Sequence, residues 1–493
     1  LNNSAGPTAG NLIRPSDGQN PRSLAIINCV GSRDKRFNEW CSNFCCMYSI
    51  KNALLVKQHY PEVDITVYYM DIRTPSKGYE EFYDRAREMG VRFSQGRPSL
   101  ITEDPETGNL YVHSEDMALG RAIEREFDMV MLNQAAVPQP DVDEMSSLLN
   151  ISQSPGGWFM EYHPKLRPMD SPTDGVFLAG ACQGVKDIPN SVAQGSAAAA
   201  RAGRVLHSDE WEIEPTVALV WAESCISGKG RKCGICSRAC PYGAIDYEQE
   251  DLQFSLDVGA IVVATGFDPF DPAVVKPYGY GKYRNVITAM EYERLISASG
   301  PTGGHLWRQS DREPVKKLAF LQCVGSRDTN KCGNGYCSAM CCMYAVKEAV
   351  IAKDHSKDDL DAAIFYMDMR THGKDFDRYY ENAKKTGVKF IRSRIHTVGP
   401  IPGSDDVLVQ YTEDEGVLKE ERFDMFVLST GLETDENVVA LSDRLGVKLD
   451  RYHFTETDSF HPVATSVPGI YACGGFTGPT AIPLSVMEAS AAA

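Results

Sequence analysis

The sequence predicts an α/β protein made of two copies of one module, joined by a short cysteine-bearing insert. Two observations lead to this fold class: strand-like apolar runs alternate with amphipathic helical segments, and the whole order of segments occurs twice. Strands that alternate with helices form βαβ units, in which helices cover a parallel sheet. We expect module 1 at residues 1–204, the insert at 205–256 and module 2 at 257–493.

Each module is expected to contain the same elements in the same order. A Gly-Pro-Thr segment precedes a buried strand, a cysteine-bearing helix, a second strand that leads into Asp-x-Arg, an aromatic amphipathic helix and a Gly-Val pair that begins a third strand. In module 1 these segments are residues 1–14, 24–27, 49–57, 65–70, 79–89 and 90–91, and in module 2 they are 295–308, 318–321, 345–353, 363–367, 376–385 and 387–388. A buried strand after Phe-Asp-Met, a Gly-bounded strand and an alanine-rich helix complete each copy.

All but two of the fifteen cysteines fall into three groups. Cysteine thiolates are soft ligands, which favour iron–sulfur clusters or zinc over hard cations. A disulfide scaffold is not expected, because the chain is long and shows no secretory signal. The groups are Cys29, Cys41, Cys45 and Cys46; Cys225, Cys233, Cys236 and Cys240; and Cys323, Cys332, Cys337, Cys341 and Cys342, while Cys182 and Cys473 stand apart.

The first and third groups occupy the turn after the first strand of each module and the helix that follows it. In a nucleotide-binding α/β unit this turn is normally glycine-rich, and its amides and the helix N-terminus hold phosphate. A thiolate-ligated cluster is likewise an anionic guest. Cys341 and Cys342 point about 100° apart on a helix, so a regular [4Fe–4S] cluster requires a distorted helix start or unusual ligand geometry. Zinc and a vicinal disulfide are the alternatives.

Three neighbouring residues need separate interpretation. Cys332 has no counterpart in module 1, and we expect it to be a bystander in a loop. Arg33 and Arg327 follow the first cysteine of each group at the same spacing. They either neutralise the charge of a bound cluster or form structural salt bridges.

The insert carries the pattern Cys233-x2-Cys236-x3-Cys240-Pro241. This pattern is the ending of a bacterial ferredoxin cysteine run, in which the proline shapes the turn. Because no second run is present, we expect Cys225 to complete one [4Fe–4S] site with the other three cysteines. Zinc is the alternative metal.

Short glycine-containing turns indicate a flavin site. The turn at residues 264–266 follows an apolar strand, and the strands that begin at Gly175 and Gly469 resemble the late strand of two-dinucleotide flavoproteins, whose next helix faces the flavin. No G-x-G-x-x-G follows a strand, so the ADP half of an FAD site is not visible in this sequence. The predicted cofactor contacts are Gly180, Ile188, Pro189, Ser191, Val192, Thr265, Gly266, Gly474, Gly475, Ile482 and Pro483.

The composition argues against several classes of partner. A net charge of −17 disfavours nucleic acid and anionic membrane surfaces. No apolar run approaches the length of a membrane span, so we expect no transmembrane helix and a cytoplasmic location. The chain begins at Leu1 rather than Met and ends at Ala493 without a capping signal. We therefore expect it to be an excerpt of a longer polypeptide.

Taken together, these motifs resemble HdrA, the A subunit of heterodisulfide reductase, and its Hdr-like relatives. The resemblance rests on the GPTGG-like and CVGSRD segments, C-x3-CCMY, the ATGFDPFD segment at 264–271 and the IP-x-SV ending, and it covers nearly the whole chain twice. It implies two thioredoxin-reductase-like modules with FAD, in which iron–sulfur clusters supplement or replace pyridine nucleotide binding. It also transfers the unusual cluster of that family onto Cys29, Cys41, Cys45 and Cys46 and onto Cys323, Cys337, Cys341 and Cys342.

The tandem arrangement resembles fused members of that family, such as the Hdr-like subunits of aromatic-ring reductase complexes or Qmo-type subunits. The resemblance implies three [4Fe–4S] clusters, at least one FAD, and a multi-subunit complex with flavin-based electron transfer, often bifurcation. Implied partners are HdrB-, HdrC- or MvhD-like subunits, ferredoxin, and hydrogenase or dehydrogenase subunits. Module 2 is expected to lack its own FAD or to borrow half of the site from another chain.

Three functions compete at this point. The first is an electron-transferring subunit that relays electrons among clusters and FAD, with the substrate reduced elsewhere and no catalytic residue of its own. The second is a self-contained FAD/NAD(P)H oxidoreductase, which the cysteine-filled nucleotide turns disfavour. The third is a zinc-binding scaffold, which the ferredoxin-type pattern of the insert disfavours.

Overall fold

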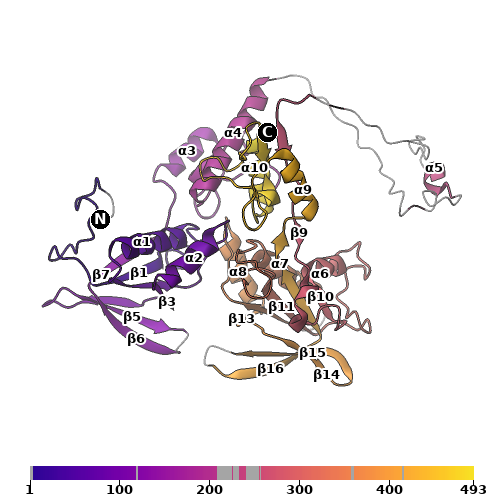
Figure 1. Ribbon diagram of the computed structural model, residues 1–493, viewed down its shortest axis with the longest axis horizontal. Helices are drawn as coiled ribbons and strands as arrows, with labels where there is room; N and C mark the ends of the chain where they lie inside the picture. Colours follow the sequence, from indigo (N-terminus) through magenta and orange to yellow (C-terminus); the bar gives the residue numbers. More distant parts are fainter. Residues whose placement is uncertain are drawn as a thin grey trace.

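The computed structural model describes residues 4–117, 120–207, 225, 233–239, 255, 257–356, 360–412 and 416–493. Within these residues the chain forms two related α/β units, each with a parallel sheet covered by helices (Figure 1). The α/β class predicted from the alternating segments is therefore confirmed. Most of the insert, including Cys240, lies outside the described residues, whereas helix α5 (Ile235–Ala239) belongs to them.

Module 1 contains, in chain order, β1 (Ser23–Val30), α1 (Cys45–His59), β2 (Asp64–Tyr69), α2 (Tyr79–Glu88), β3 (Arg92–Gln95), β4 (Leu100–Glu103), β5 (Leu110–Asp116), β6 (Arg121–Phe127) and β7 (Met129–Gln134). The parallel sheet has the order β3-β2-β1-β7. Alternate residues of β1 face opposite ways: Ile26 packs with Ile50 of α1, while Ala25 packs with Val112 of the antiparallel sheet β4-β5-β6. The core therefore has a helix layer on one face and a second sheet on the other.

Module 2 repeats this plan and adds an edge strand. Its parallel sheet has the order β10-β17-β11-β12-β13, and β14-β15-β16 is antiparallel. Thr288 and Glu291 form a reciprocal capping box that starts helix α6 after β10. The elements are β10 (Val286–Thr288), α6 (Ala289–Ile296), β11 (Lys317–Val324), α7 (Cys341–His355), β12 (Asp361–Tyr366), α8 (Phe376–Lys385), β13 (Lys389–Arg392), β14 (Val398–Ile401), β15 (Ser404–Thr412), β16 (Leu418–Phe423) and β17 (Met425–Thr430).

Two boundaries differ from the prediction. The cysteine-bearing helices begin at Cys45 and Cys341, whereas the Cys-x3-Cys-Cys pattern predicted that they open with Cys41 and Cys337. Those two cysteines lie before the helix, because Asn43 and Ala339 have left-handed φ angles that a helix does not accommodate. The third strand begins at Arg92, after the Gly-Val pair, because Gly90 has a φ of +81° and ends α2.

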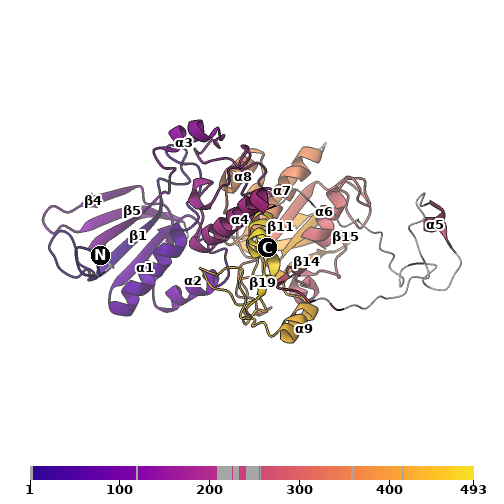
Figure 2. The ribbon, with the colours of Figure 1, turned by 90° about the horizontal axis from the view of Figure 1, so that it is seen from above.

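The remaining elements lie between and beside the two sheets (Figure 2). Small side chains such as Ala197 let α4 and α10 pack closely around Met487, and β19 pairs with β8 in parallel. No helix among the described residues is long and apolar enough to cross a membrane. These elements are α3 (Val142–Leu149), α4 (Ile188–His207), β8 (Ile261–Val263), β9 (Asp268–Pro269), β18 (Leu432–Glu433), α9 (Glu436–Leu445), β19 (Ile470–Ala472) and α10 (Ile482–Ala492).

Candidate functional site

The first cysteine of each module lies in an irregular strand end. The pairing of β1 with β7 and that of β11 with β17 both shift register near the end of the strand. Cys29 and Cys323 fall within these shifts and have φ angles of +60° and +61°, which residues other than glycine rarely adopt. A bulge redirects a side chain that a regular strand would place elsewhere. The same irregularity therefore positions both cysteines.

The structure brings the predicted cysteines of each module together. We call Cys29, Cys41, Cys45 and Cys46 set 1, and Cys323, Cys337, Cys341 and Cys342 set 2. In set 1 the thiol of Cys45, at the start of α1, hydrogen-bonds to both Cys29 and Cys46. Set 2 has the same arrangement, with the Cys341 thiol at its centre. Three of the four cysteines in set 1, and three in set 2, are buried.

The surroundings of each set favour a thiolate at its first cysteine and disfavour one at its central cysteine. The hydrogen bonds made by Cys45 and Cys341, together with burial, raise the pKa of these two thiols. The hydrogen bond from Cys45 lowers the pKa of the Cys29 thiol to about 6, and the positive charges of Arg33 and Arg73 act in the same direction, while burial opposes them. In set 2 the hydrogen bond from Cys341 likewise lowers the pKa of Cys323 to about 6. Thiolates rather than thiols ligate metals, so each set contains a group prepared for that role.

The loops that carry the sets contain further left-handed residues at matching places. Arg33 and Arg327 have φ angles of +55° and +53°, and Asn43 and Ala339 have +64° and +60°. Such conformations cost about 1–3 kcal/mol each and cluster at functional sites. The backbone is therefore irregular just before each cysteine-bearing helix, and it is irregular at matching places in both modules.

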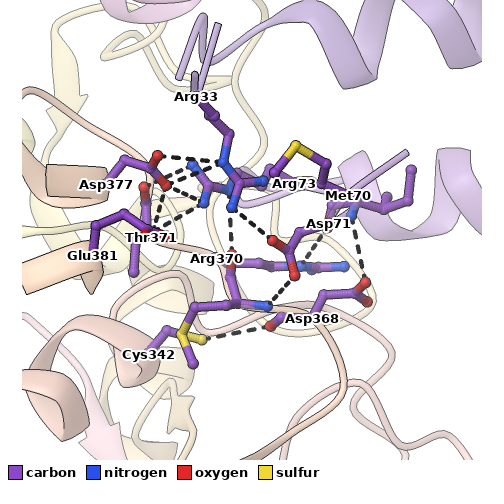
Figure 3. A network of polar contacts seen from close by, with 12 residues as sticks. Arg33, Met70, Asp71, Arg73, Cys342, Asp368, Arg370, Thr371, Asp377 and Glu381 are labelled. Atoms are coloured by element: carbon purple, nitrogen blue, oxygen red, sulfur yellow. Dashed lines mark hydrogen bonds and ion pairs between the residues drawn. The ribbon is translucent and has the colours of Figure 1, made fainter. Parts of the chain in front are cut away.

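Four buried arginines lie beside the two sets and pair across the boundary between the modules. Figure 3 shows three of them, Arg33, Arg73 and Arg370. Arg33 pairs with Asp71 of its own module at 2.9 Å, and Arg33 and Arg73 both pair with Asp377 of module 2, at 3.3 and 2.5 Å. The exposed fraction of the Arg73 side chain is 1%. The salt-bridge role considered for Arg33 is therefore present, and its charge also acts on Cys29.

Module 2 shows the reciprocal arrangement. Arg327 pairs with its own Asp368 at 2.9 Å and with Glu80 of module 1 at 2.8 Å, and Arg370 pairs with Glu80 at 2.6 Å. The arginines also cross the boundary to donate to backbone carbonyls: Arg73 Nε donates to Met369, and Arg370 Nε to Ile72, at 3.2 and 3.1 Å. The interface is thus approximately two-fold.

The donor sets fit an iron–sulfur cluster by their chemistry. Each consists of four thiols beside two guanidinium groups, and the buried Nη1 atoms of Arg33 and Arg327 have no hydrogen-bond partner in the described chain. Such donors suit the sulfur atoms of an anionic cluster. In the ranges that the structure covers, no group of three or more His, Cys, Asp or Glu side chains is spaced to hold a metal ion. The assignment of these cysteines as ligands stays a prediction.

Most of the insert, which carries the third predicted cluster site, lies outside the described residues. Cys233 is half-buried, Cys236 is exposed on α5 and Cys225 is an isolated described residue. Cys240 is not among the described residues. Cys332 donates to the Asp328 carbonyl at 3.1 Å, as expected of a loop residue with a local partner.

The predicted flavin contacts form two separate turns. In module 1, Gly180 has a φ of +71° in a short 3₁₀ turn, and Ile188, Pro189, Ser191 and Val192 begin α4. In module 2 the corresponding turn, Gly474 and Gly475, lies against Gly266, which with Thr265 follows β8, and Ile482 and Pro483 begin α10. A Cβ on Gly475 would lie 3.1 Å from the Gly266 carbonyl, so this approach requires glycine.

The two turns differ in the side chain that faces them from the following helix. Gly474 donates its N–H to the partly buried carboxylate of Glu488 at 2.7 Å. The equivalent position of α4 is Gln194, whose side chain donates to Gln183 instead. An internal carboxylate therefore occupies the turn of module 2 that the sequence suggested for a flavin.

Glu80 and Asp377, which supply the acidic charge across the boundary, were not predicted from the sequence. Both are second residues of an amphipathic helix, and both accept a hydrogen bond from a nearby threonine, Thr74 or Thr371. The signal was present, since an acid stands at the same place in both copies. Local sequence patterns do not reveal contacts between modules, so the arginines that pair with these two acids could not be predicted.

A cavity of about 730 Å³ opens between the modules beside set 2. Its walls include α2 and β3 of module 1 and the ends of β12 and β13 of module 2, and Glu80, Arg327 and Asp368 line it. The charged pairs behind set 2 therefore border a groove.

Comparison with known proteins gives a family and a set of close relatives. The model of the pyridine nucleotide-disulphide oxidoreductase family matches residues 174–493. One of the iron-sulfur A subunits of CoB–CoM heterodisulfide reductase in Methanopyrus kandleri, the one numbered 2, is 54% identical over 253 residues, which cover 51% of this chain and 38% of that protein. The A subunit of the H(2):CoB-CoM heterodisulfide,ferredoxin reductase of Methanothermobacter thermautotrophicus is 47% identical over 249 residues, covering 50% and 37%.

These relatives confirm, over half of the chain, the resemblance to the A subunit of heterodisulfide reductase that the motifs indicated. The match spans less than two fifths of each relative's own length. Among solved structures, a thioredoxin reductase of T. acidophilum aligns with 96% of the chain at 10% identity and a TM-score of 0.32, a similarity too low to support an argument.

Proposed function

Because this chain belongs to the pyridine nucleotide-disulphide oxidoreductase family, we propose that it is an electron-transferring flavo-iron–sulfur subunit of an Hdr-like oxidoreductase complex. The observation that carries the proposal is the repeated thiol site. At the same place in both modules, three cysteines are in contact, a fourth is near enough for its charge to act on the first, and one thiol has a pKa of about 6. Two buried arginines lie beside each set.

We assign one [4Fe–4S] cluster to each set, and a third to Cys225, Cys233, Cys236 and Cys240. Bound clusters carry single electrons, and FAD converts between one- and two-electron transfers. The chain's own residues bind and shield: Cys29 and Cys323 supply thiolate, burial excludes water, and Arg33 and Arg327 offset negative charge. No described residue needs to act on a substrate in this role.

The FAD assignment rests on the turn and helix start of module 1. Gly180 and the first residues of α4, from Ile188 to Val192, are proposed to face the flavin, with the rest of the site outside this chain. In module 2 the Gly474 amide is already bonded to Glu488. This supports one FAD, bound by module 1, rather than two.

The relatives bear names of subunits that act with other chains on a CoB–CoM heterodisulfide and on ferredoxin. We propose, on this ground, that the present chain also works within a multi-subunit complex, with HdrB- or HdrC-like subunits or ferredoxin as the next electron carriers. We further propose that the complex carries out flavin-based electron bifurcation.

Anaerobic reconstitution with iron and sulfide tests the proposal. The wild-type chain is expected to bind iron and sulfide for three clusters, and Cys45→Ser to lose about one third of the iron while its circular dichroism spectrum stays unchanged. Cys182→Ser is the matched control, because Cys182 is exposed and stands outside the groups. Zinc in place of iron, or a disulfide between Cys45 and Cys46 in the purified chain, would contradict the assignment.

A further inference from the structure

The acids beside each cysteine set come from both modules. Asp71 and Asp368 pair with the arginine of their own module, whereas Glu80 and Asp377 each reach into the other. Figure 3 shows Asp377 contacting Arg33 and Arg73 together. Each set is therefore completed by one carboxylate that its own module does not contain.

The two sets are also connected by a short chain of contacts. The Cys46 sulfur lies 3.7 Å from the Asp71 carbonyl oxygen, and the Asp71 carboxylate accepts the Met369 N–H at 3.0 Å. The neighbouring Asp368 presents its carbonyl oxygen 3.8 Å from the Cys342 sulfur. The charges at the boundary thus lie close to both sets, and their side chains are largely buried, so water screens them only weakly.

Charge balance at the boundary is even: the four arginines Arg33, Arg73, Arg327 and Arg370 face the four acids Asp71, Glu80, Asp368 and Asp377. Removing one acid leaves an uncompensated positive charge beside one set. Glu80 pairs with both arginines of module 2, and its charge also acts on Cys323 and Cys337.

We propose that Glu80 and Asp377 are positioning residues that act between modules, each setting how readily the cluster held by the other module accepts an electron. The proposal rests on the proposed function, since it requires a cluster at each set. Glu80 serves set 2 and Asp377 serves set 1, through the arginines that they hold. Reduction adds one negative charge to a cluster, so loss of a nearby carboxylate favours reduction.

The test uses the reconstituted full chain and redox titration followed by electron paramagnetic resonance. Cys41→Ser leaves set 2 as the intact module site, Cys337→Ser leaves set 1, and the double variant gives the signal of the insert for subtraction. In the Cys41→Ser background, Glu80→Gln is expected to raise the reduction potential of set 2 by at least a tenfold change in equilibrium constant, about 59 mV for one electron. In the Cys337→Ser background, where set 1 is the intact module site, Glu80→Gln is expected to change the equilibrium constant for reduction of set 1 by less than twofold.

Three further variants make the result specific. Glu81→Gln is the matched control: it removes the next acid of α2, whose partner is the exposed Arg451, and should leave both potentials unchanged. Glu80→Asp keeps the negative charge, so the equilibrium constant for reduction of set 2 should stay within threefold of the wild-type value. Asp377→Asn is the independent reciprocal arm and should raise the potential of set 1.

Equal shifts for Glu80→Gln and Glu81→Gln, or a Glu80→Gln shift at both sets alike, would overturn the inference while leaving the proposed function standing. If the Cys41→Ser and Cys337→Ser chains bind no more iron than the double variant, no cluster forms at either set, and both the proposed function and the inference fail.

Discussion

Modules 1 and 2 share the geometry of their cysteine sets but differ in the residues that surround them. The bulged strand, the left-handed residues and the cross-boundary arginines occur at matching positions. Around them, module 1 offers Asn52 where module 2 has Glu348, and Gln194 where module 2 has Glu488. The geometry shared by the two cysteine sets therefore depends on backbone strain and ion pairing. The additional carboxylates, Glu348 and Glu488, belong to module 2 alone.

The largest expected effect comes from breaking the boundary that relates the modules. Arg370→Ala removes a buried cation and leaves Glu80 with one partner, which should lower the free energy of unfolding by about 3–5 kcal/mol. Urea unfolding of the full chain is expected to split into two transitions. Arg451→Ala, at an exposed pair across the same boundary, should cost less than about 1 kcal/mol. Equal losses for the two variants would contradict a boundary held by buried ion pairs.

A second prediction sharpens the difference at Glu348. Burial raises the pKa of this carboxyl from 4.5 to about 9, so the folded chain keeps a proton that the unfolded chain releases. Stability is then fully present below pH 4.5 and declines as the pH rises toward 9. Glu348→Gln should stabilise the chain by roughly 1–3 kcal/mol at pH 8 and hardly at pH 4.5. Thermal unfolding of the wild-type chain and of Glu348→Gln at both pH values measures this difference in stability.

The same experiment has a natural control in the other module. Asn52→Asp places an acid at the position that corresponds to Glu348. It is expected to introduce a similar pH-dependent destabilisation in module 1. If Glu348→Gln gave the same gain at both pH values, packing rather than ionisation would be responsible.

The smallest effect is expected at the extra cysteine of module 2. Cys332 is half-buried, and its hydrogen bonds within the described chain are local: it donates to the Asp328 carbonyl and accepts from the Asn334 backbone. Cys332→Ala should therefore change the free energy of unfolding by less than about 1 kcal/mol and leave the iron content unchanged. A loss of one cluster's iron would place Cys332 among the ligands instead.

Much of the fold could be predicted, because local patterns of apolar residues indicate most of its strands and helices. Leu24 to Ile27 form a short continuous apolar run, as expected of a strand covered on both faces, and the second copy repeats it. The helix that follows was expected to open with Cys41 but begins at Cys45, because Asn43 has a left-handed φ of +64°. Cysteine spacing carries no information about that backbone angle.

The site was predictable in part. Cysteine spacing indicated which thiols belong together, and the structure places Cys29, Cys45 and Cys46 in contact. The acids Glu80 and Asp377 could not be assigned, because their roles depend on a contact between residues some 250 to 345 positions apart in the chain. Only the docked pair of modules reveals it.

Covalent linkage of the two copies has a genetic consequence. In an assembly of identical chains, every mutation appears on both sides of a two-fold interface. Here Glu80 and Asp377 are encoded by separate codons, and they already differ by one methylene. Selection can therefore adjust one half of the boundary without altering the other, which is a freedom that a symmetric dimer lacks.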